Sequence, residues 1–393
     1  MRKLSFSVVA VFFLLAFVGA SVGQDFKQVH PGVEYVQVQH KIGSDPVKIN
    51  LLRLDLKKVR LDVHHALDRA IGLETTSSIA KRKGAVAAIN AGFFRLDKSA
   101  WAGDAAGILV IDKKVLSENS NGRIALSLSN EKRQTSAFIN TVRVTARAGF
   151  GVDSGFRFDG INRERKANEI ILFTPEFNGS TLTDGSGTEV VLSKCRPRPY
   201  TPRCEKASIQ SVGNSQIPAD GFVISIGKDS LARSANVVNF ARKSDNPNVA
   251  VEDLISIQFD LFAVDKDLSI EAEDITNGVP RLVRNRKIDI TWEQEKASKA
   301  FAETRHPRTA VAKLKDGKFL MVTVDGRQPG VSVGMSLQEL AEYLLSLGAV
   351  DAMNLDGGGS TTMFLDGKVV NTPSDKEGER KIGDAIVVSL RKK

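Results

Sequence analysis

Short segments of alternating apolar and polar residues recur along most of the chain, and this period of two constrains the fold more than any other feature. Side chains on a β-strand point alternately to its two faces, so the pattern predicts strands with one buried face. The clearest segments are VKINLLRLDL, KVRLDVHHAL, AVAAINAGFF, GILVIDKKVL, GFVISI, FLMVTVD and DAIVVSL. We therefore predict an α+β fold of strand-dominated mixed sheets with a few helices.

Two segments have helical rather than strand spacing. In SLQELAEYLLSLG, Ser336 is a predicted N-cap, Glu339 completes a capping box, and Gly348 is a C-terminal stop. WEQEKASKAFAETR, residues 292–305, predicts another helix.

One motif occurs twice. GAVAAIN, from Gly84 to Asn90, matches GAVDAMN, from Gly348 to Asn354, at five of seven positions. A helix-like segment precedes each copy, and a strand-like hairpin precedes that helix and follows the motif. This order predicts an internal duplication with a pseudo-twofold axis that brings the two asparagines together.

The first 23 residues read as a targeting segment. Arg2 and Lys3 precede an apolar run from Val8 to Val18, and small residues follow. This arrangement predicts a signal peptide over residues 1–23, and hence a secreted or periplasmic protein. An uncleaved membrane anchor is the alternative, although the run is short for a span of ~20 residues.

Residues 24–393 are then predicted to form one domain with a strand-rich insertion at about 160–275. Cys195 and Cys204, in CRPRPYTPRC, are expected to pair in an oxidising compartment. The formal net charge of +9 suits anionic polymers or an ordinary solvated surface. No dense basic run with interleaved aromatic residues occurs, so nucleic acid is not an expected partner.

Polar clusters follow several predicted strands in the C-terminal third. Asp325 follows FLMVTV, and Asp356 follows AVDAMNL. Two carboxylates at strand ends suggest acid/base work, displacement at a sugar carbon, or a metal pair. Arg308 and Arg327 offer grips for phosphate or carboxylate, and the backbone of Gly357–Gly359 could present N–H groups to an anion.

Each of these features also has a simpler interpretation. Asp325 and Gly326 could form an ordinary turn, the glycines a surface loop, and Arg308 a structural ion pair. Their concentration in one part of the chain favours a functional site. The Walker A pattern and the G-x-S-x-G elbow are both absent, which argues against a nucleotide loop and a serine hydrolase.

The motifs INAGFF, HPRTAVA, VDGRQPGVSVGMSLQELA, NLDGGGSTTM, VVNTPSD and ERKIGDAIVV resemble, in residues and in order, those of the phosphodiester glycosidase family. Ala91 is a departure, since some relatives carry glycine there. The resemblance covers most of residues 24–393 and implies hydrolysis of a sugar-1-phosphodiester at its anomeric carbon, giving free sugar and a phosphomonoester. Bacterial relatives are exported and linked with exopolysaccharide.

The resemblance also implies a site. Asp356 would act at the anomeric carbon as nucleophile or base, with Asp325 as its partner carboxylate. Arg308 and Arg327 would hold phosphate, while Asn90 and Asn354 would bind sugar hydroxyls. The full set of implied substrate-binding residues is Asn90, Gly92, Arg308, Thr309, Arg327, Asn354, Gly357, Gly358, Gly359, Ser360, Asn371, Ser374, Asp375 and Arg380.

Three alternatives remain open from sequence. The chain could be a glycosidase for ordinary glycan linkages, a non-catalytic binder of anionic cell-surface polysaccharide, or a divalent-metal hydrolase built on Asp325, Asp356 and Asp375. No cofactor is otherwise expected. The expected partner is a phosphorylated sugar or cell-surface glycan, with no nucleic acid and no stable membrane insertion after signal cleavage.

Overall fold

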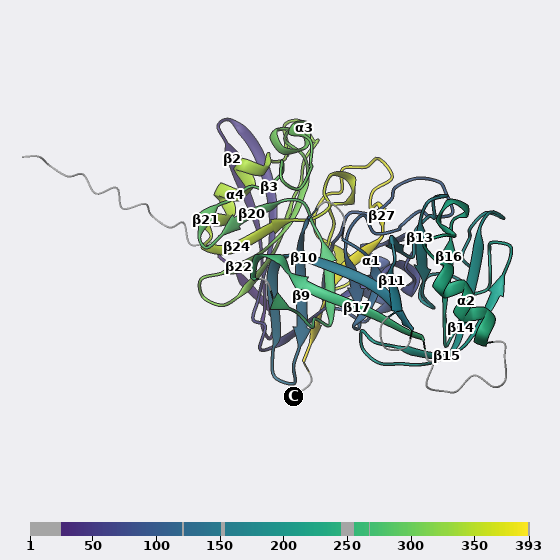
Figure 1. Ribbon diagram of the computed structural model, residues 1–393. Helices are drawn as coiled ribbons and strands as arrows, with labels where there is room; N and C mark the ends of the chain where they lie inside the picture. The colour runs from purple at the N-terminus through teal and green to yellow at the C-terminus, as the bar shows by residue number, and fades with distance from the viewer. Residues whose placement is uncertain (1–24, 120–121, 151–153, 245–254, 267, 392–393) are drawn as a thin grey trace, which may run out of the picture.

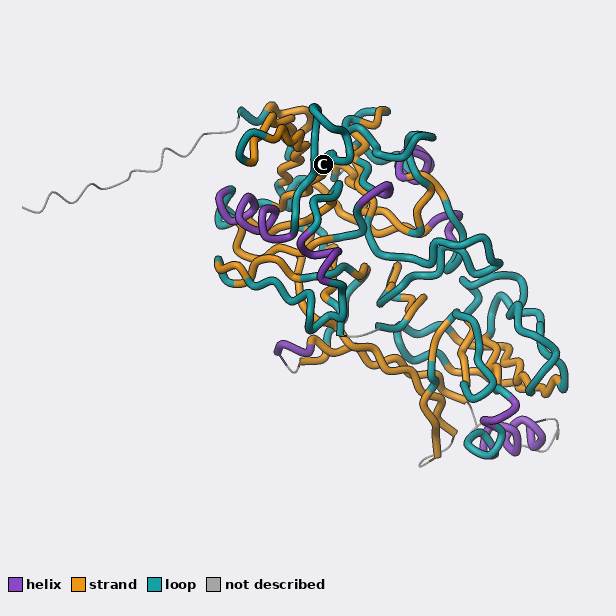
Figure 2. The backbone as a smooth tube through the Cα atoms, turned by 90° about the horizontal axis from the view of Figure 1, so that it is seen from above, coloured by secondary structure: helices purple, strands orange, loops and turns teal. Residues whose placement is uncertain are grey.

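The computed structural model describes residues 25–391 apart from 120–121, 151–153, 245–254 and 267, so the predicted signal peptide lies outside the described residues. Strands and loops make up most of the chain (Figure 2), which confirms the predicted α+β, strand-dominated fold. Among the described helices, none has the length and apolarity that a bilayer span requires.

An eight-stranded antiparallel sheet forms one side of the molecule (Figure 1). Its strands, in spatial order, are β1 (Lys27–His30), β2 (Val33–Ile42), β3 (Asp45–Leu54), β23 (Phe319–Val324), β22 (Arg308–Leu314), β24 (Ala349–Asn354), β20 (Arg281–Arg284) and β21 (Lys287–Ile288). Alternation along β23 separates two cores: Met321 faces the inner core, whereas Leu320 and Val322 pack with α4 (Leu337–Ser346). The sheet is therefore buried on both faces at its centre.

A five-stranded sheet shares the inner core with the first sheet. Its strands are β26 (Lys368–Val369), β25 (Met363–Leu365), β6 (Ala87–Asn90), β28 (Asp384–Leu390) and β4 (Val59–His65). The helix α1 (Thr76–Arg82) packs beside it, and β5 (Glu74–Thr75) pairs with β27 (Lys381–Ile382). Buried side chains such as Ile89 and Met353 bring the two sheets together.

The remaining strands form a larger sheet that carries the middle of the chain. In spatial order they are β12 (Gly160–Ile161), β13 (Ile170–Phe173), β16 (Phe222–Ile226), β14 (Thr188–Arg196), β15 (Arg203–Gln210), β17 (Ile255–Ala263), β10 (Thr135–Phe150), β9 (Ile124–Asn130), β19 (Asp274–Asn277), β7 (Leu109–Ile111) and β8 (Lys114–Ser117), with β11 (Ser154–Arg157) on β10 and β18 (Leu268–Ser269) on β17. Figure 1 shows the long strands β10 and β17 running toward a lobe that includes β13, β16 and α2 (Ala235–Ser244).

The segment predicted as an insertion, about 160–275, supplies most of this lobe. Its strands continue a sheet that already contains β7 to β10, so the segment is paired into the fold rather than standing apart. The domain boundaries themselves stay a prediction. The expected disulfide is confirmed: Cys195 and Cys204 lie directly opposite each other on β14 and β15, with their Cα atoms 3.9 Å apart.

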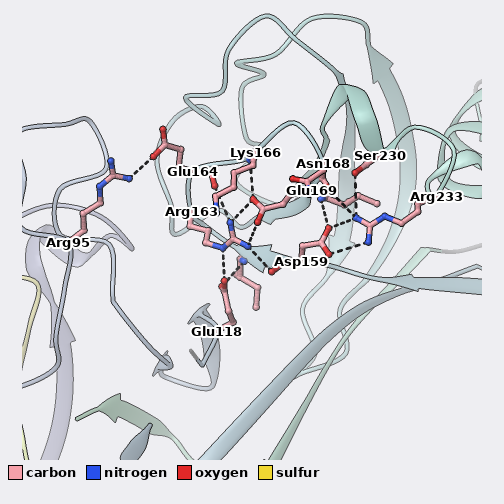
Figure 3. A network of polar contacts seen from close by, with 12 residues as sticks. Arg95, Glu118, Asp159, Arg163, Glu164, Lys166, Asn168, Glu169, Ser230 and Arg233 are labelled. Carbon is pink, nitrogen blue, oxygen red and sulfur yellow. Dashed lines mark hydrogen bonds and ion pairs between the residues drawn. The ribbon is translucent and has the colours of Figure 1, made fainter. Parts of the chain in front are cut away.

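Charged side chains fasten the lobe to the loop that follows β6 (Figure 3). Arg163 donates from Nε to Glu118 at 2.6 Å and from Nη1 to Glu169 at 2.8 Å. Arg95 donates to Glu164 at 2.7 Å. Arg95 and Glu118 precede the middle segment, so the bonds Arg163–Glu118 and Arg95–Glu164 join the two parts. The bond from Arg163 to Glu169 lies within the segment.

The capping signals of α4 are confirmed. The Ser336 hydroxyl accepts from the Glu339 N–H at 3.2 Å, Glu339 returns the capping-box bond, and Gly348 adopts a φ of +88°. The helix expected over 292–305 is wrong in length, since only α3 (Lys299–Glu303) forms.

The reason for the short helix is Glu295, which is turned inward. Its carboxylate accepts from the N–H groups of Ile124 and Arg281, both at 2.9 Å. The helix therefore starts later, where the Ser298 hydroxyl accepts from the Phe301 N–H at 3.1 Å. The spacing of residues within the segment does not reveal a carboxylate whose hydrogen-bond partners lie elsewhere in the chain.

The predicted duplication has mixed support. The order of strand, strand, helix, strand and hairpin occurs as β3, β4, α1, β6, β7–β8 and again as β22, β23, α4, β24, β25–β26. However, β22 pairs with β23, whereas β3 and β4 belong to different sheets. The order recurs without the pairing, so a duplication stays a prediction.

Candidate functional site

The end of β6, the start of β22 and the loop after β24 meet where the eight-stranded and five-stranded sheets adjoin. Asp356 donates its backbone N–H to Ala91 O at 2.9 Å, just beyond β6. Leu355 donates to Thr309 O at 2.8 Å, and Gly358 donates to Pro307 O at 2.9 Å, both at the start of β22. Segments far apart in sequence are thus joined by main-chain bonds at one place.

Asp356 is half-buried, as is Asp375 of the same cluster. Its Oδ1 accepts from the Gly357 N–H at 2.9 Å, and its backbone carbonyl accepts from Asn90 Nδ2 at 2.6 Å. Burial raises the pKa of Asp356 to about 6, against the lowering effects of the Ser360 hydroxyl, the Gly357 N–H and Arg380. A carboxyl that titrates near neutrality suits acid/base or nucleophilic chemistry.

The first two glycines of the triplet are required by close neighbours. A Cβ on Gly357 would lie 2.8 Å from the Pro307 carbonyl oxygen. Gly358 has a φ of +61°, and a Cβ there would lie 3.1 Å from Arg327 Nη2. The positive φ favours glycine at position 358, and the close approach to the Pro307 backbone excludes a side chain at position 357. The triplet is therefore an ordered turn pressed against β22 and Arg327.

Gly359 supports a charged pair. Arg380 donates to the Asp375 carboxylate through Nε at 2.7 Å and Nη2 at 3.1 Å. A Cβ on Gly359 would clash with both Arg380 Nη2 and Asp375 Oδ1. The absence of a side chain at this position lets the pair lie across the turn, where Arg380 lowers the pKa of Asp356.

Arg308 is buried, with 1% of its surface exposed. Its Nε donates to Met335 O at 2.9 Å, and its Nη2 donates to Phe301 O at 2.8 Å and Thr304 O at 2.9 Å. Burial lowers its pKa to about 10. These bonds commit most of the guanidinium to the chain itself, so a grip on phosphate stays a prediction for this residue.

Arg327 is placed differently. It is exposed, and its guanidinium lies over the turn at Gly358. It makes no ion pair with any carboxylate of the described residues. Of the two predicted phosphate grips, Arg327 is the one with a guanidinium available to a ligand.

Asp325 is fully enclosed, with a side-chain exposure of 0%. Its oxygens accept from Asn371 Nδ2 at 3.2 Å and from the Thr372 N–H at 3.1 Å, and Lys48 Nζ lies 3.9 Å away. Burial raises its pKa. Through these bonds Asp325 holds the loop at 371–372 in place, behind the turn that bears Asp356.

The predicted asparagines also lie in the interior. Thr309 Oγ1 donates to Asn90 Oδ1 at 2.7 Å, and the Thr362 N–H donates to the same oxygen at 3.1 Å. Asn354 Nδ2 donates to the carbonyls of Val279 and Leu355 at 2.6 and 2.7 Å. Asn90 thus ties the end of β6 to β22, and Asn354 ties the end of β24 to the segment before β20. The predicted convergence of the two side chains stays a prediction.

Several buried oxygens near the turn lack a partner among the described residues. They are Asn354 Oδ1, Thr361 Oγ1, Thr362 Oγ1 and Ser374 Oγ. Buried polar atoms usually have a partner in the protein or in ordered water. Their concentration beside Asp356 therefore indicates a place that accepts water or a polar ligand.

Sequence reasoning missed a second polar layer behind Gly92. Asp384 accepts from the Gly92 N–H at 2.9 Å and from Thr276 Oγ1 at 2.6 Å, and burial raises its pKa. Asn277 Oδ1 accepts from the Phe93 N–H at 3.1 Å. Asp384 begins β28 and Asn277 ends β19, so the strand-end signal that singled out Asp325 could also have found them.

Two cavities of about 500 Å³ lie apart from this cluster. One adjoins the disulfide loop, and the other lies between α3 and the start of α4; neither is lined by a predicted catalytic or substrate-binding residue. Across the described ranges, no group of three or more His, Cys, Asp or Glu could hold a metal ion. The metal alternative on Asp325, Asp356 and Asp375 therefore gains no geometric support.

Comparisons with known proteins place this geometry in context. The phosphodiester glycosidase family matches residues 205–389. N-acetylglucosamine-1-phosphodiester alpha-N-acetylglucosaminidase of Bos taurus is 36% identical over 110 residues, 26% of this chain and 20% of that protein. The SPbeta prophage-derived uncharacterized protein YomE of Bacillus subtilis is 38% identical over 85 residues, 22% of this chain and 13% of that protein.

These two relatives are matched over a fifth of their length or less. A solved structure from Burkholderia pseudomallei, of a protein named for its expected export, covers 88% of this chain and 74% of its own, with a TM-score of 0.70 and 22% identity. At that identity the likeness establishes a shared fold.

Proposed function

Since this chain belongs to the phosphodiester glycosidase family through residues 205–389, we propose that it is a hydrolase that cleaves the anomeric C–O bond of a sugar-1-phosphodiester. The products are free sugar and a phosphomonoester. The observation that carries the proposal is the partly exposed Asp356, whose pKa of about 6 is set beside an ordered glycine turn and two guanidinium groups.

The chemistry needs charge stabilisation more than a strong acid, because a phosphomonoester is already a good leaving group. Arg327 lies free over the turn and would hold the phosphate. The C1–O bond breaks with its electron pair going to the phosphate oxygen, and the sugar carbon becomes oxocarbenium-like. Ionised Asp356 would then attack that carbon directly or take the proton of an attacking water.

The buried residues of the predicted set have supporting parts in this proposal. Asp325 and Asn371 hold the following loop, Arg308 holds the segment before β22, and Asn90 fixes the backbone of Asp356. Charge stabilisation by fixed groups works only if those groups do not reorganise during the reaction. The enclosed network supports that requirement around Asp356.

The direct test incubates the protein with a panel of sugar-1-phosphodiesters and detects free sugar and phosphomonoester by mass. Asp356→Asn is expected to lower kcat/KM by roughly 10²–10³ or more, in line with the loss of one preorganised electrostatic group. Asp316→Asn, in the exposed turn between β22 and β23, is the matched control and should retain activity.

Other outcomes would replace this function. Cleavage of plain glycosides without cleavage of phosphodiesters would make the protein an ordinary glycosidase. Tight glycan binding without product, unchanged by Asp356→Asn, would make it a non-catalytic binder.

Export belongs to the same proposal. Residues 1–23 have the charge and apolar pattern of a signal peptide, and the structurally similar Burkholderia protein is named for expected export. Amino-terminal sequencing of protein made in its host should give a start at Gln24. A protein retaining Met1 in the cytoplasm would contradict export while leaving the hydrolase proposal intact.

A further inference from the structure

The solvent face of the middle lobe carries exposed arginines on neighbouring strands, among them Arg143 on β10, and four others are here called the arginine face. They are Arg147 on β10, Arg157 on β11, Arg196 on β14 and Arg203 on β15. All four are exposed, and the side chains of Arg147 and Arg196 are 52% and 68% exposed. None belongs to the candidate site described above.

The pairing register places these arginines on one side of the sheet. Arg147 on β10 lies opposite Arg157 on β11. Two residues further along β10, Gly149 lies opposite Ser256 on β17, and Ser256 lies opposite Arg203 on β15. Arg203 in turn lies opposite Arg196 on β14. Residues directly opposite each other, and residues two apart on one strand, share a face. The intervening residues are buried on the core side, namely Ala148, Cys204, Ile255 and Ile257.

Two like-charge pairs therefore stand directly opposite each other, Arg147 with Arg157 and Arg196 with Arg203. Like charges in this arrangement destabilise a sheet. Asp260 balances Arg147 and Glu205 balances Arg196. Within the described residues, Arg157 and Arg203 make no ion pair.

Each opposed pair thus has one arginine, Arg157 or Arg203, whose exposed guanidinium is available to an anion that is not part of the chain. Guanidinium groups bind sulfate, phosphate and carboxylate in a bidentate fashion. Between the arginines lie Gly149, Ser256 and Gln258 rather than aromatic rings, which single-stranded nucleic acid would use for base stacking. Small and hydroxyl- or amide-bearing side chains suit an extended chain of hydroxyl-rich sugars.

We propose that the arginine face is a second binding surface, which holds an anionic polysaccharide away from the site of hydrolysis. The choice of a glycan over another polyanion rests on the proposed function, whereas the anion-binding surface itself rests on the register and exposure of the arginines. The surface would keep the enzyme on a polymer whose sugar phosphates it cleaves.

The test measures binding of the full chain to dextran sulfate, neutral dextran and oligodeoxythymidine at several salt concentrations. The variant pair Arg157→Glu with Arg203→Glu removes the two unbalanced charges. The control pair Lys57→Glu with Lys287→Glu makes the same change in net charge at two other exposed positions, in the turn before β4 and on β21. All proteins are also assayed on a small soluble sugar-1-phosphodiester.

Dextran sulfate should bind to the wild type and to the control pair, and roughly tenfold more weakly to the arginine variant, with a shallower salt dependence. Activity on the small substrate should not change. The milder Arg157→Gln should weaken binding while keeping or raising Tm, because it removes a like-charge pair.

Several results would overturn the proposal. These are no binding of dextran sulfate near physiological salt, equal binding of neutral dextran, equal loss in the control pair, or equally tight binding of oligodeoxythymidine. If the protein binds dextran sulfate as expected but cleaves no phosphodiester, the proposed function fails and the anion-binding surface stands.

Discussion

At the scale of single residues, Asp356 is the proposed reacting group. The residue is half-buried, and its backbone is tied on both sides, to Ala91 through its N–H and to Asn90 through its carbonyl. The side chain can therefore meet a ligand without freedom to drift. Its surroundings also determine the pH range in which its carboxylate is ionised.

The first prediction concerns pH. Burial raises the pKa of Asp356 to about 6, and a nucleophile or base must be ionised. The kcat/KM for a sugar-1-phosphodiester should therefore rise with pH through about 6 and then level off. The profile is measured from pH 4.5 to 8. A rate that instead falls through this region would identify Asp356 as a general acid.

Asp384 should tune that profile without touching substrate. Its negative charge raises the pKa of Asp356, so Asp384→Asn should move the rising limb to lower pH. Thr276→Val keeps the carboxyl but removes a hydrogen bond that lowers the pKa of Asp384, so it should shift the limb in the same direction by a smaller amount. A larger shift in Thr276→Val than in Asp384→Asn would contradict the prediction.

Gly359 offers a test of the turn. A methyl group there would collide with the ends of the Arg380 and Asp375 side chains, so Gly359→Ala should displace this partly exposed pair, cost about 1 kcal/mol or less in free energy of unfolding and reduce kcat/KM. Gly179→Ala, where nothing lies within 4 Å of the added carbon, should stay within about 0.5 kcal/mol. Chemical denaturation and activity assays measure both. If the Gly359→Ala protein has native stability, the Arg380–Asp375 pair can move away from the turn without loss of stability.

At the scale of elements, local signals predicted those features whose causes are local. Ser336, Glu339 and Gly348 define α4 from within its own segment, and the short apolar run FLMVTV predicts β23, which is buried on both faces. Glu295 shortens α3 because its partners come from residues far away in sequence. Sheet membership failed for the same reason, as β3 and β4 adjoin in sequence but join different sheets.

The candidate site shows the same limit. Polar residues at strand ends could be found from sequence, and most of those named lie in one cluster. Sequence could not separate Arg327, which is free, from Arg308, whose donors are taken by carbonyls near α3. Nor could it tell the enclosed Asp325 from the partly exposed Asp356, because that difference depends on the loop at 371–372.

At the scale of the whole molecule, the charged contacts of Arg163 hold the lobe to the rest. Arg163→Met would leave Glu118 and Glu169 without their shared partner and should cost about 2 kcal/mol in free energy of unfolding. Arg95→Met breaks the more exposed contact with Glu164 and should cost less than about 1 kcal/mol. Denaturation curves measure both effects. Equal losses would show that Arg163 contributes no more to the free energy of unfolding than Arg95 does.

The same junction should make stability depend on pH. Burial raises the pKa of Asp104 from its ordinary 3.8 to about 8, and the charge of Glu118 adds to the effect, while Arg163 and Arg95 oppose it. Between about pH 4 and 8 the unfolded carboxyl is ionised while the folded one keeps its proton. The folded state thus binds more protons there, and stability falls as pH rises.

Tm should accordingly be higher at pH 5 than at pH 8, and calorimetry at one-unit steps measures the slope. Asp104→Asn removes this group's contribution and should flatten the curve in part, since Asp274, with a pKa raised to about 7 by burial, acts in the same direction. A double change with Asp274→Asn should flatten it further. If Asp104→Asn leaves the dependence of Tm on pH between pH 5 and 8 unchanged, Asp104 is already ionised in the folded protein. Water would then reach the junction between lobe and core more readily than its contacts indicate.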